Sequence, residues 1–278
     1  MTERIIIFTD LDGTLLDKKY SYESALPALA LIESHKIPLV LCSSKTRSEI
    51  EFYRAKLNND HPFICENGGG VFIPIGYFGP NVIIPGHHRA LNNQYDVITL
   101  GANYPDLRKT LMRLQKEGYL IKGFGDMSVE EISQAMGLTI HEAKMAQQRD
   151  FDEPFFYEDE EQKIDDLLNS IKQKGFTITK GRIYHLLGQS DKGKAVSILT
   201  DLYTQKHGAV TTMGIGDSQN DLPMMEKVDI PIVVKKPDGT YDDSIAVPKL
   251  IKAQGIGPSG WNDVMISLIL KLLNPSMK

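Results

Sequence analysis

Two aspartates near the N-terminus, Asp10 and Asp12, come after the apolar run Ile5–Phe8 and before Gly13 and Thr14. An apolar run of this kind is typical of a buried strand. Two carboxylates at the end of a buried strand repel each other and lose hydration, so their placement is unfavourable unless something compensates. A bound cation would compensate, and Mg²⁺ takes oxygen ligands of this type. The sequence therefore predicts a magnesium site that includes Asp10 and Asp12.

A second acidic cluster, Asp217 and Asp221, lies in the segment Gly216–Asp221, which follows the apolar segment Thr211–Ile215. Carboxylates from two loops suit Mg²⁺, which would also neutralise a phosphate brought against them. A carboxylate can itself attack phosphorus. Taken alone, Asp217 could equally be a turn residue, but the two clusters together indicate phosphoryl-transfer chemistry.

Ser43 and Lys192 are the other candidate catalytic residues. Ser43 ends the apolar segment Ile37–Cys42 and could donate a hydrogen bond to a phosphate oxygen. Lys192 stands at the start of a predicted helix, where an anion is already favoured. Each also has a purely structural interpretation: Ser43 as a helix cap, and Lys192 as a solvated lysine. Their order along the chain together with the acidic clusters favours a phosphate site.

The elements that must position these residues alternate between strands and helices. Residues 4–9, 37–42 and 63–65 are predicted strands, and residues 24–35 form a predicted helix. A second helix is predicted to begin at the capping box Thr46–Glu49. Such alternation indicates a parallel sheet, whose ligand site lies at the carboxyl ends of its strands.

The middle of the chain departs from this pattern. Residues 74–86 are rich in Gly and Pro and are interpreted as a connector. The segments that follow mix strands, a predicted hairpin at residues 176–187 and helices, two of which are predicted to begin at the capping boxes Ser128–Glu131 and Thr139–Glu142. The first pattern returns afterwards, and residues 251–273 are predicted to be largely helical, with an interruption near residues 255–260. We therefore expect an α/β fold: residues 1–85 and 189–278 form a Rossmann-like parallel-sheet core, and residues 86–188 form an inserted α+β cap domain.

The composition excludes several classes of protein. The chain has 278 residues, a formal net charge of −5 and 24% charged residues, which argues against binding to nucleic acid or to an anionic membrane. Its two cysteines, Cys42 and Cys65, stand among apolar residues and are expected to be free thiols. The sequence shows no signal peptide and no apolar run long enough for a membrane span. We expect a cytoplasmic location.

The segments Asp10–Thr14 and Gly216–Asp221, with Ser43 and Lys192, resemble the four motifs of the haloacid dehalogenase superfamily. The inserted segment between the second and third motifs is similar to that of the subgroup with the larger α/β cap. The resemblance implies that Asp10 is the nucleophile.

The same resemblance implies a role for each of the other motif residues. Asp12 would be the general acid/base, and its backbone carbonyl would also bind Mg²⁺. Ser43 and Lys192 would hold the phosphate. Asp217 would be a metal ligand, supported by Asp221 and Asn220.

A narrower resemblance concerns residues 136–155, which are similar to the cap signature of mannosyl-3-phosphoglycerate phosphatases. The segment Cys42–Thr46 agrees with it, since many relatives in the cap subgroup carry Thr-Gly-Arg there. This implies a small-molecule substrate in which a sugar is joined to a phosphorylated glycerate. Arg149 would offer a bidentate fork to an anion and Glu153 would accept sugar hydroxyls, although both could be solvated or form a structural ion pair. The remaining expected substrate-binding residues are Ser44, Lys45, Asn67, Gly68 and Gly69.

The leading hypothesis is a Mg²⁺-dependent phosphatase that hydrolyses mannosyl-3-phosphoglycerate to mannosylglycerate through an aspartyl-phosphate. A broader sugar phosphatase, a glucosyl-3-phosphoglycerate phosphatase and a phosphomutase remain open alternatives. A signalling phospho-acceptor protein is the alternative from another class, but such domains are shorter and lack an insertion of this size. We interpret His141 and His185 as structural and the pair His87 and His88 as surface residues.

Overall fold

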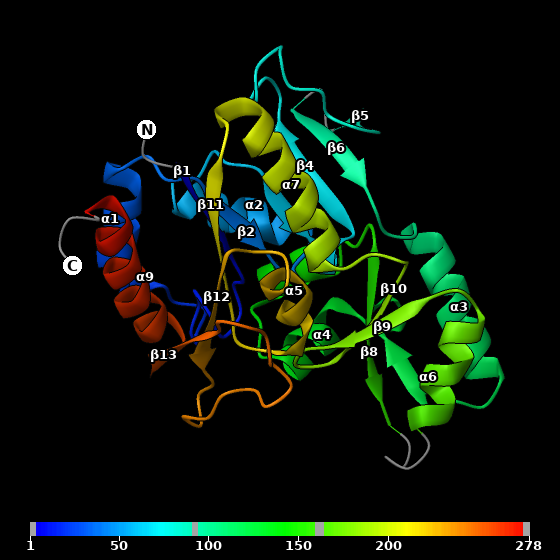
Figure 1. The fold of residues 1–278 in the computed structure, drawn as a ribbon. Coiled ribbons are helices and arrows are strands. Elements are labelled where there is room, and N and C mark those ends of the chain that lie inside the picture. The colour runs from blue at the N-terminus through cyan, green and yellow to red at the C-terminus, as the bar shows by residue number, and fades with distance from the viewer. Residues whose placement is uncertain (1–3, 91–93, 159–163, 275–278) are drawn as a thin grey trace.

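A computed structural model describes residues 4–90, 94–158 and 164–274. It contains a nine-stranded sheet of order β13-β12-β11-β1-β2-β3-β4-β6-β5 and, beside it, a four-stranded antiparallel sheet of order β7-β8-β10-β9 (Figure 1). The strands of the large sheet are β1 (Arg4–Thr9), β2 (Leu39–Cys42), β3 (Phe63–Cys65), β4 (Gly70–Pro74), β5 (His88–Ala90), β6 (Tyr95–Thr99), β11 (Val210–Gly216), β12 (Ile230–Lys235) and β13 (Ile251–Ile256).

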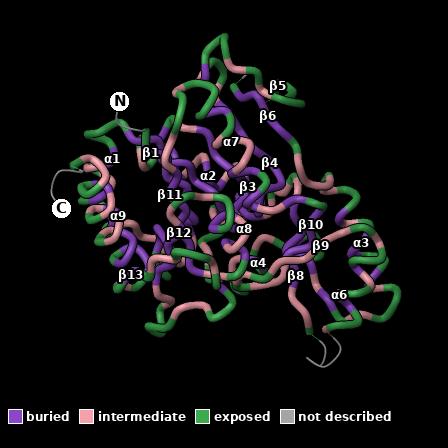
Figure 2. The backbone as a smooth tube through the Cα atoms, viewed as in Figure 1, coloured by how far each residue is buried: buried purple, intermediate pink, exposed green. Residues whose placement is uncertain are grey.

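The large sheet is parallel from β13 to β3, as the alternation of strands and helices predicted. The pairings of β4 with β3 and β6, and of β5 with β6, are antiparallel and extend one edge. Strand β1 lies between β2 and β11, with Arg4 opposite Val210 in parallel register. The N-terminal strand is therefore in the middle of the sheet, and Figure 2 shows the sheet's central strands buried.

Both faces of the large sheet are covered, because side chains alternate along its strands. Ile5 and Ile7 of β1 pack with residues of three helices on one face, and Ile6 and Phe8 pack with residues of two others on the opposite face. The first face is covered by α1 (Leu26–Ser34), α2 (Arg47–Lys56) and α9 (Gly257–Leu273), and the second by α7 (Lys192–His207) and α8 (Leu222–Met225). The predicted capping box at Thr46 and Glu49 is confirmed at the start of α2.

The smaller sheet and its helices form the cap, which we define as residues 104–187. Helices α3 (Tyr104–Lys116) and α6 (Ile164–Gln173) pack against one face of the sheet, and α4 (Val129–Met136) and α5 (Ile140–Ala146) pack together beside it. Both helices of the second pair begin with the capping boxes that the sequence predicted, at Ser128 and Thr139. The strands are β7 (Ile121–Gly123), β8 (Asp152–Tyr157), β9 (Thr177–Lys180) and β10 (Tyr184–Leu187).

Two expectations need revision. Strands β5 and β6 fall within the segment predicted to form the inserted domain, yet they pair with β4 in the large sheet. We therefore propose that the insertion begins after Thr99 rather than at residue 86. Residues 251–256 form the edge strand β13 and not a helix, because their burial alternates with a period of two and Gly257 takes a positive φ of 47° that interrupts the chain.

Among the described helices, none has the length and apolar character needed to cross a membrane.

Candidate active site

The polar clusters that the sequence singled out come together at one edge of the large sheet. Asp10 follows β1, Ser43 follows β2, and Asp217 follows β11, so each stands at the carboxyl end of a parallel strand. Lys192 is the first residue of α7, whose preceding residue Asp191 caps the helix by accepting a hydrogen bond from the Lys194 amide. The sheet thus assembles a site from segments that are far apart in the sequence.

A buried lysine joins two of the aspartates. Lys192 Nζ lies 2.8 Å from Asp10 Oδ1 and 2.6 Å from Asp221 Oδ1, and the lysine side chain is fully buried. The second oxygen of Asp221 accepts hydrogen bonds from the amides of Asp217 and Ser218, at 3.0 and 3.2 Å. Asp221 therefore holds both the lysine and the loop that carries Asp217.

The pKa values in this cluster are shifted by burial and by mutual repulsion. Burial raises the pKa of Asp10 well above its usual range, against the opposing pull of Lys192, and the neighbouring carboxylates raise it further. Burial and the charge of Asp221 raise the pKa of Asp217 to about 7. Burial lowers the pKa of Lys192, but the charges of Asp10 and Asp221 outweigh that effect, so its pKa is raised. The aspartates carry more negative charge than one lysine neutralises.

The carboxylates of Asp10, Asp217 and Asp221 fit a hard divalent cation. One oxygen from each lies within 4.8 Å of the others, and all three residues are buried. Gly13 makes room at this point: its φ is +79°, and a Cβ there would lie 2.4 Å from Asp217 Oδ2. Three buried carboxylates whose oxygens lie this close together match the preference of Mg²⁺ for oxygen ligands.

A cleft of about 720 Å³ separates this edge of the core from the cap. The core side of the cleft is lined by Asp10, Asp12, Ser44, Lys45, Asp217 and Asn220. The cap side is lined by Phe124, Met136, Leu138, Arg149, Ile183 and His185. The cleft is charged where it meets the core and largely apolar where it meets the cap, so it suits a ligand with an anionic end and a less polar body.

Lys45 lies beside Asp12 at the mouth of the cleft. Its Nζ is 3.1 Å from Asp12 Oδ1 and 3.2 Å from Glu49 Oε1, and it sits 4.7 Å from the centre of the Tyr20 ring. The Asp12 side chain keeps 43% of its surface exposed, in contrast to the buried Asp10. Asp12 is thus more exposed to the cleft than Asp10, and Lys45 forms an ion pair with it.

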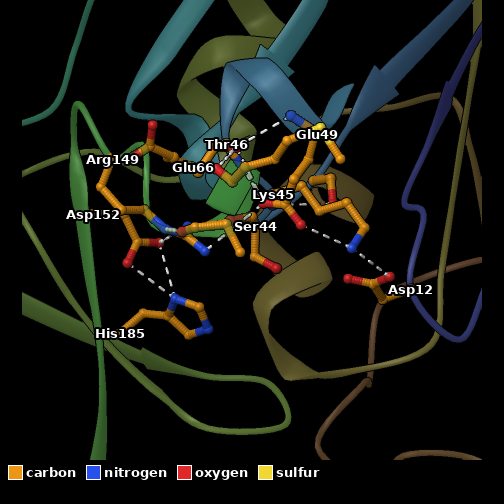
Figure 3. A network of polar contacts seen from close by, with 12 residues as sticks. Asp12, Ser44, Lys45, Thr46, Glu49, Glu66, Arg149, Asp152 and His185 are labelled. Carbon is orange, nitrogen blue, oxygen red and sulfur yellow. Dashed lines mark hydrogen bonds and ion pairs between the residues drawn. The ribbon is translucent and has the colours of Figure 1, made fainter. Parts of the chain in front are cut away.

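Arg149 connects the cap to the core. Its Nε donates to the carbonyl oxygen of Ala146 and its Nη1 to that of Ser44, both at 2.8 Å (Figure 3). Its guanidinium also lies 4.0 Å from carboxylate oxygens of Glu49 and Asp152. Its Nε and Nη1 are bonded to backbone carbonyls and its charge lies near two carboxylates, so contacts within the protein fix the arginine at the border of the cleft.

Other predicted substrate-binding residues are not presented to the cleft. Glu153 is fully buried on the face of β8 that meets α3, where Arg108 Nη1 lies 2.8 Å from its Oε1. The prediction that Glu153 accepts a sugar hydroxyl is inconsistent with this position. The amides of Asn67 and Gly69 donate to the carbonyls of Ser43 and Glu66, so they are not available for a glycerate carboxylate.

Gly68 and Ser43 are buried, and neither lines the cleft. Gly68 has a φ of +90°, and a Cβ there would lie 2.2 Å from the carbonyl oxygen of Asp191, so this glycine lets the loop after β3 pack against the start of α7. Ser43 is fully buried, and its Oγ accepts a hydrogen bond from the Lys45 amide at 3.3 Å. Both residues are placed to shape the site that Lys192 enters.

The sequence did not single out Glu66, Asp152 or His185 as site residues. The Glu66 carboxylate accepts hydrogen bonds from the amides of Asp150 and Phe151 at 2.8 to 3.1 Å, and its burial raises its pKa to about 8 against the opposing charge of Arg149. Asp152 and His185 form a pair on the cleft side of the cap sheet. For Asp152 the available signal was that side chains alternate between the two faces of β8. Deciding which face meets the cleft also requires the pairing of β8 with β10, which carries His185.

Comparison with known proteins gives three main results. A profile of the haloacid dehalogenase-like hydrolase family matches residues 7–238. The chain is 46% identical over 269 residues to a glucosyl-3-phosphoglycerate/mannosyl-3-phosphoglycerate phosphatase of Methanococcoides burtonii, covering 96% of this chain and 97% of that protein. It is 39% identical over 230 residues to a mannosyl-3-phosphoglycerate phosphatase of Pyrococcus furiosus, covering 82% and 90%.

A solved structure, the sucrose-phosphatase of Synechocystis sp., has a similar fold. The TM-score is 0.62 at 12% sequence identity, with 97% of this chain and 98% of that chain covered. The agreement extends over both the large sheet and the cap.

Proposed function

This chain belongs to the haloacid dehalogenase-like hydrolase family, and from that premise we propose that it is a phosphatase acting on glycosyl-3-phosphoglycerates. The observation that carries the proposal is the cluster of Asp10, Asp217 and Asp221 with Lys192 between two of them, open to a cleft beneath the cap. Such a cluster concentrates charge where a phosphoryl group must be positioned and neutralised.

In the proposed reaction Asp10 attacks phosphorus and becomes an aspartyl-phosphate, while the bond to the leaving oxygen of the glycerate breaks. Asp12 donates a proton to that oxygen and then accepts one from the water that hydrolyses the intermediate. The exposed position of the Asp12 carboxylate, next to the cleft, suits a group that exchanges protons with substrate and water. Its pairing with Lys45 fixes its orientation.

Lys192 and Ser43 would bind the phosphate oxygens. The lysine already lies 2.8 Å from the Asp10 carboxylate, so a phosphate brought to Asp10 comes within its reach. The Ser43 Oγ accepts from the Lys45 amide, which leaves its hydroxyl hydrogen for a phosphate oxygen. The carboxylates of Asp10, Asp217 and Asp221 would hold Mg²⁺, together with the backbone carbonyl of Asp12. When bound, this ion supplies positive charge that offsets the repulsion between the phosphate and the carboxylates.

The proposal includes both the mannosyl and the glucosyl substrate. The name of the relative from M. burtonii includes both the glucosyl and the mannosyl compound, and the name of the relative from P. furiosus includes only the mannosyl compound. The apolar side chains on the cap side of the cleft, such as Phe124 and Leu138, can pack on a sugar ring without distinguishing one hydroxyl's orientation.

Phosphate release from a panel of substrates tests the proposal. The panel consists of mannosyl- and glucosyl-3-phosphoglycerate, 3-phosphoglycerate, mannose 6-phosphate and an aryl phosphate, each with Mg²⁺ and with a chelator. We expect metal-dependent release with a strong preference for the two glycosyl compounds. Comparable rates on every compound would overturn the substrate assignment and indicate a broad sugar phosphatase. An isomerised phosphosugar in place of free phosphate would identify a mutase.

A further inference from the structure

A buried pair in the cap sheet, Asp152 and His185, faces the cleft from adjacent strands. His185 Nδ1 lies 3.0 and 2.9 Å from the two carboxylate oxygens of Asp152, and the Asp152 side chain is fully buried. Figure 3 shows the second ring nitrogen on the side of the ring away from Asp152. His185 lines the cleft, and in the described parts of the chain its Nε2 has no hydrogen-bond partner.

The position of this pair is fixed from the core. Asn67 Nδ2 donates to Asp152 Oδ2 at 2.9 Å, and Asn67 Oδ1 accepts from Asn220 Nδ2 at 3.1 Å. Asn220 stands in the loop that carries Asp217, and its Oδ1 lies 2.8 Å from Ser218 Oγ. A continuous set of hydrogen bonds therefore runs from the acidic loop of the core to the histidine of the cap.

Three described cap side chains that line the cleft are polar or charged: Arg149, Arg182 and His185. Arg149 is bound to the carbonyls of Ala146 and Ser44, and Arg182 is exposed with its Nη1 on the carbonyl of Met136. His185 alone of the three is both buried and left with a ring nitrogen free toward the cleft. A rigid polar atom among mainly apolar side chains is a typical specificity element of a ligand site.

We propose that His185 determines specificity by binding a sugar hydroxyl of the substrate through Nε2, with Asp152 as the residue that positions it. The assignment rests on the proposed function, because it supposes a substrate whose leaving group carries a sugar. With the hydrogen on Nδ1 donated to Asp152, Nε2 is left for a sugar hydroxyl, which it can bind through a lone pair in the neutral ring or through its hydrogen in the protonated ring. A site built to bind a hydroxyl discriminates strongly against a compound that lacks it.

Substitution of His185 by Asn tests this assignment. The Asn amide nitrogen can take the place of Nδ1 and keep the bond to Asp152, but nothing then reaches the position of Nε2. We expect kcat/KM for the glycosyl-3-phosphoglycerates to fall about 10- to 100-fold, and kcat/KM for 3-phosphoglycerate and an aryl phosphate to change less than about threefold. His185→Gln, whose longer amide reaches the Nε2 position, should recover part of the loss.

The control is His141→Asn, which makes the same change at an exposed histidine of the cap and should leave all rates unchanged. An equal fall on every substrate would overturn the proposal and make His185 a structural residue. A fall on 3-phosphoglycerate as large as on the glycosyl compounds would place the contact on the glycerate, and no fall on the glycosyl compounds would exclude a contact.

Failure of the proposed function is visible in the wild type, as the absence of a preference for glycosyl-3-phosphoglycerates. If the wild type instead prefers mannose 6-phosphate, the role of His185 is tested with two substrates, mannose 6-phosphate and the aryl phosphate. His185→Asn should then lower kcat/KM for mannose 6-phosphate relative to kcat/KM for the aryl phosphate. A wild type that prefers no sugar compound would overturn both.

Discussion

Arg149 of the cap donates a hydrogen bond from Nη1 to the backbone carbonyl oxygen of Ser44 in the core, across 2.8 Å. Two further contacts fix the same segment of the cap to the core. Thr46 Oγ1 donates to the carbonyl oxygen of Met145 at 2.9 Å, and the Glu66 carboxylate accepts from the amides of residues 150 and 151. The middle of the cap sequence is thus held by the loops that follow β2 and β3.

Arg149→Met should destabilise the protein and slow all substrates alike. The substitution leaves the buried carboxylates of Glu49 and Asp152 without this cation and frees the Ser44 carbonyl, which should cost about 3–5 kcal/mol. The anion contact that the sequence suggested for Arg149 would instead give a selective rise in KM for the phosphoglycerate substrate. Urea unfolding and kinetics on mannosyl-3-phosphoglycerate and an aryl phosphate measure both effects, and a rise in KM confined to the former would restore a direct contact.

Asp10→Asn should abolish turnover while the protein stays folded. The amide cannot attack phosphorus, so we expect kcat to fall by at least about 10³-fold. The substitution also removes a carboxyl group whose pKa is raised well above its usual range by burial, so stability in the absence of metal should not fall. Phosphate release and thermal unfolding test this, with the exposed Asp165→Asn as a control for the substitution itself. Turnover near the wild-type rate would disprove the assignment of the nucleophile.

Addition of Mg²⁺ should raise the Tm, and a chelator should lower it. Burial and the charge of Asp221 raise the pKa of Asp217, and a cation bound by Asp10, Asp217 and Asp221 would offset both effects. A ligand present at 100 times its Kd stabilises the folded state by about 2.7 kcal/mol. In Asp217→Asn the effect of Mg²⁺ should shrink. Differential scanning calorimetry over a metal titration measures it, and an equal shift in wild type and variant would place the ion elsewhere.

Glu66 should make stability depend on pH between about 4.5 and 8. Its pKa is about 8 in the folded protein, raised by burial from 4.5, so the folded state binds a proton more tightly than the unfolded chain. Stability from this group is therefore complete below pH 4.5 and is lost as the pH rises through 8. Glu66→Gln should flatten the dependence of unfolding free energy on pH across this window. The same change at exposed Glu23 serves as the control, and parallel curves for Glu66→Gln and wild type would contradict the prediction.

Much of the fold could be predicted from local sequence because its signals are local. The apolar run before Asp10 and the capping boxes at Thr46, Ser128 and Thr139 each involve only a few neighbouring residues, and the structure confirms these elements. Residues 251–256 were wrongly predicted as helix because the edge strand β13 depends on pairing with β12.

The cap side of the site was less predictable because it depends on long-range pairing. Strand alternation places Asp152 and Glu153 on opposite faces of β8, but only the position of the cap sheet decides which face meets the cleft. His185 meets the cleft because its strand pairs with β8, opposite Pro154. For the core, by contrast, the general rule that ligands bind at the carboxyl ends of parallel strands was sufficient to bring Asp10 and Asp217 together.

The placement of β1 between β2 and β11 has a consequence for synthesis of the protein. Asp10 leaves the ribosome 182 residues before Lys192, its partner in the folded site. Until β11 is made, the side of β1 that pairs with it remains open, because its hydrogen-bonding partner does not yet exist. A chain terminated before Lys192 carries Asp10 and Asp12 without the lysine and the acidic loop, so under the proposed mechanism we expect it to be inactive. It also leaves open the edge of β1 that pairs with β11, and an open apolar edge favours aggregation.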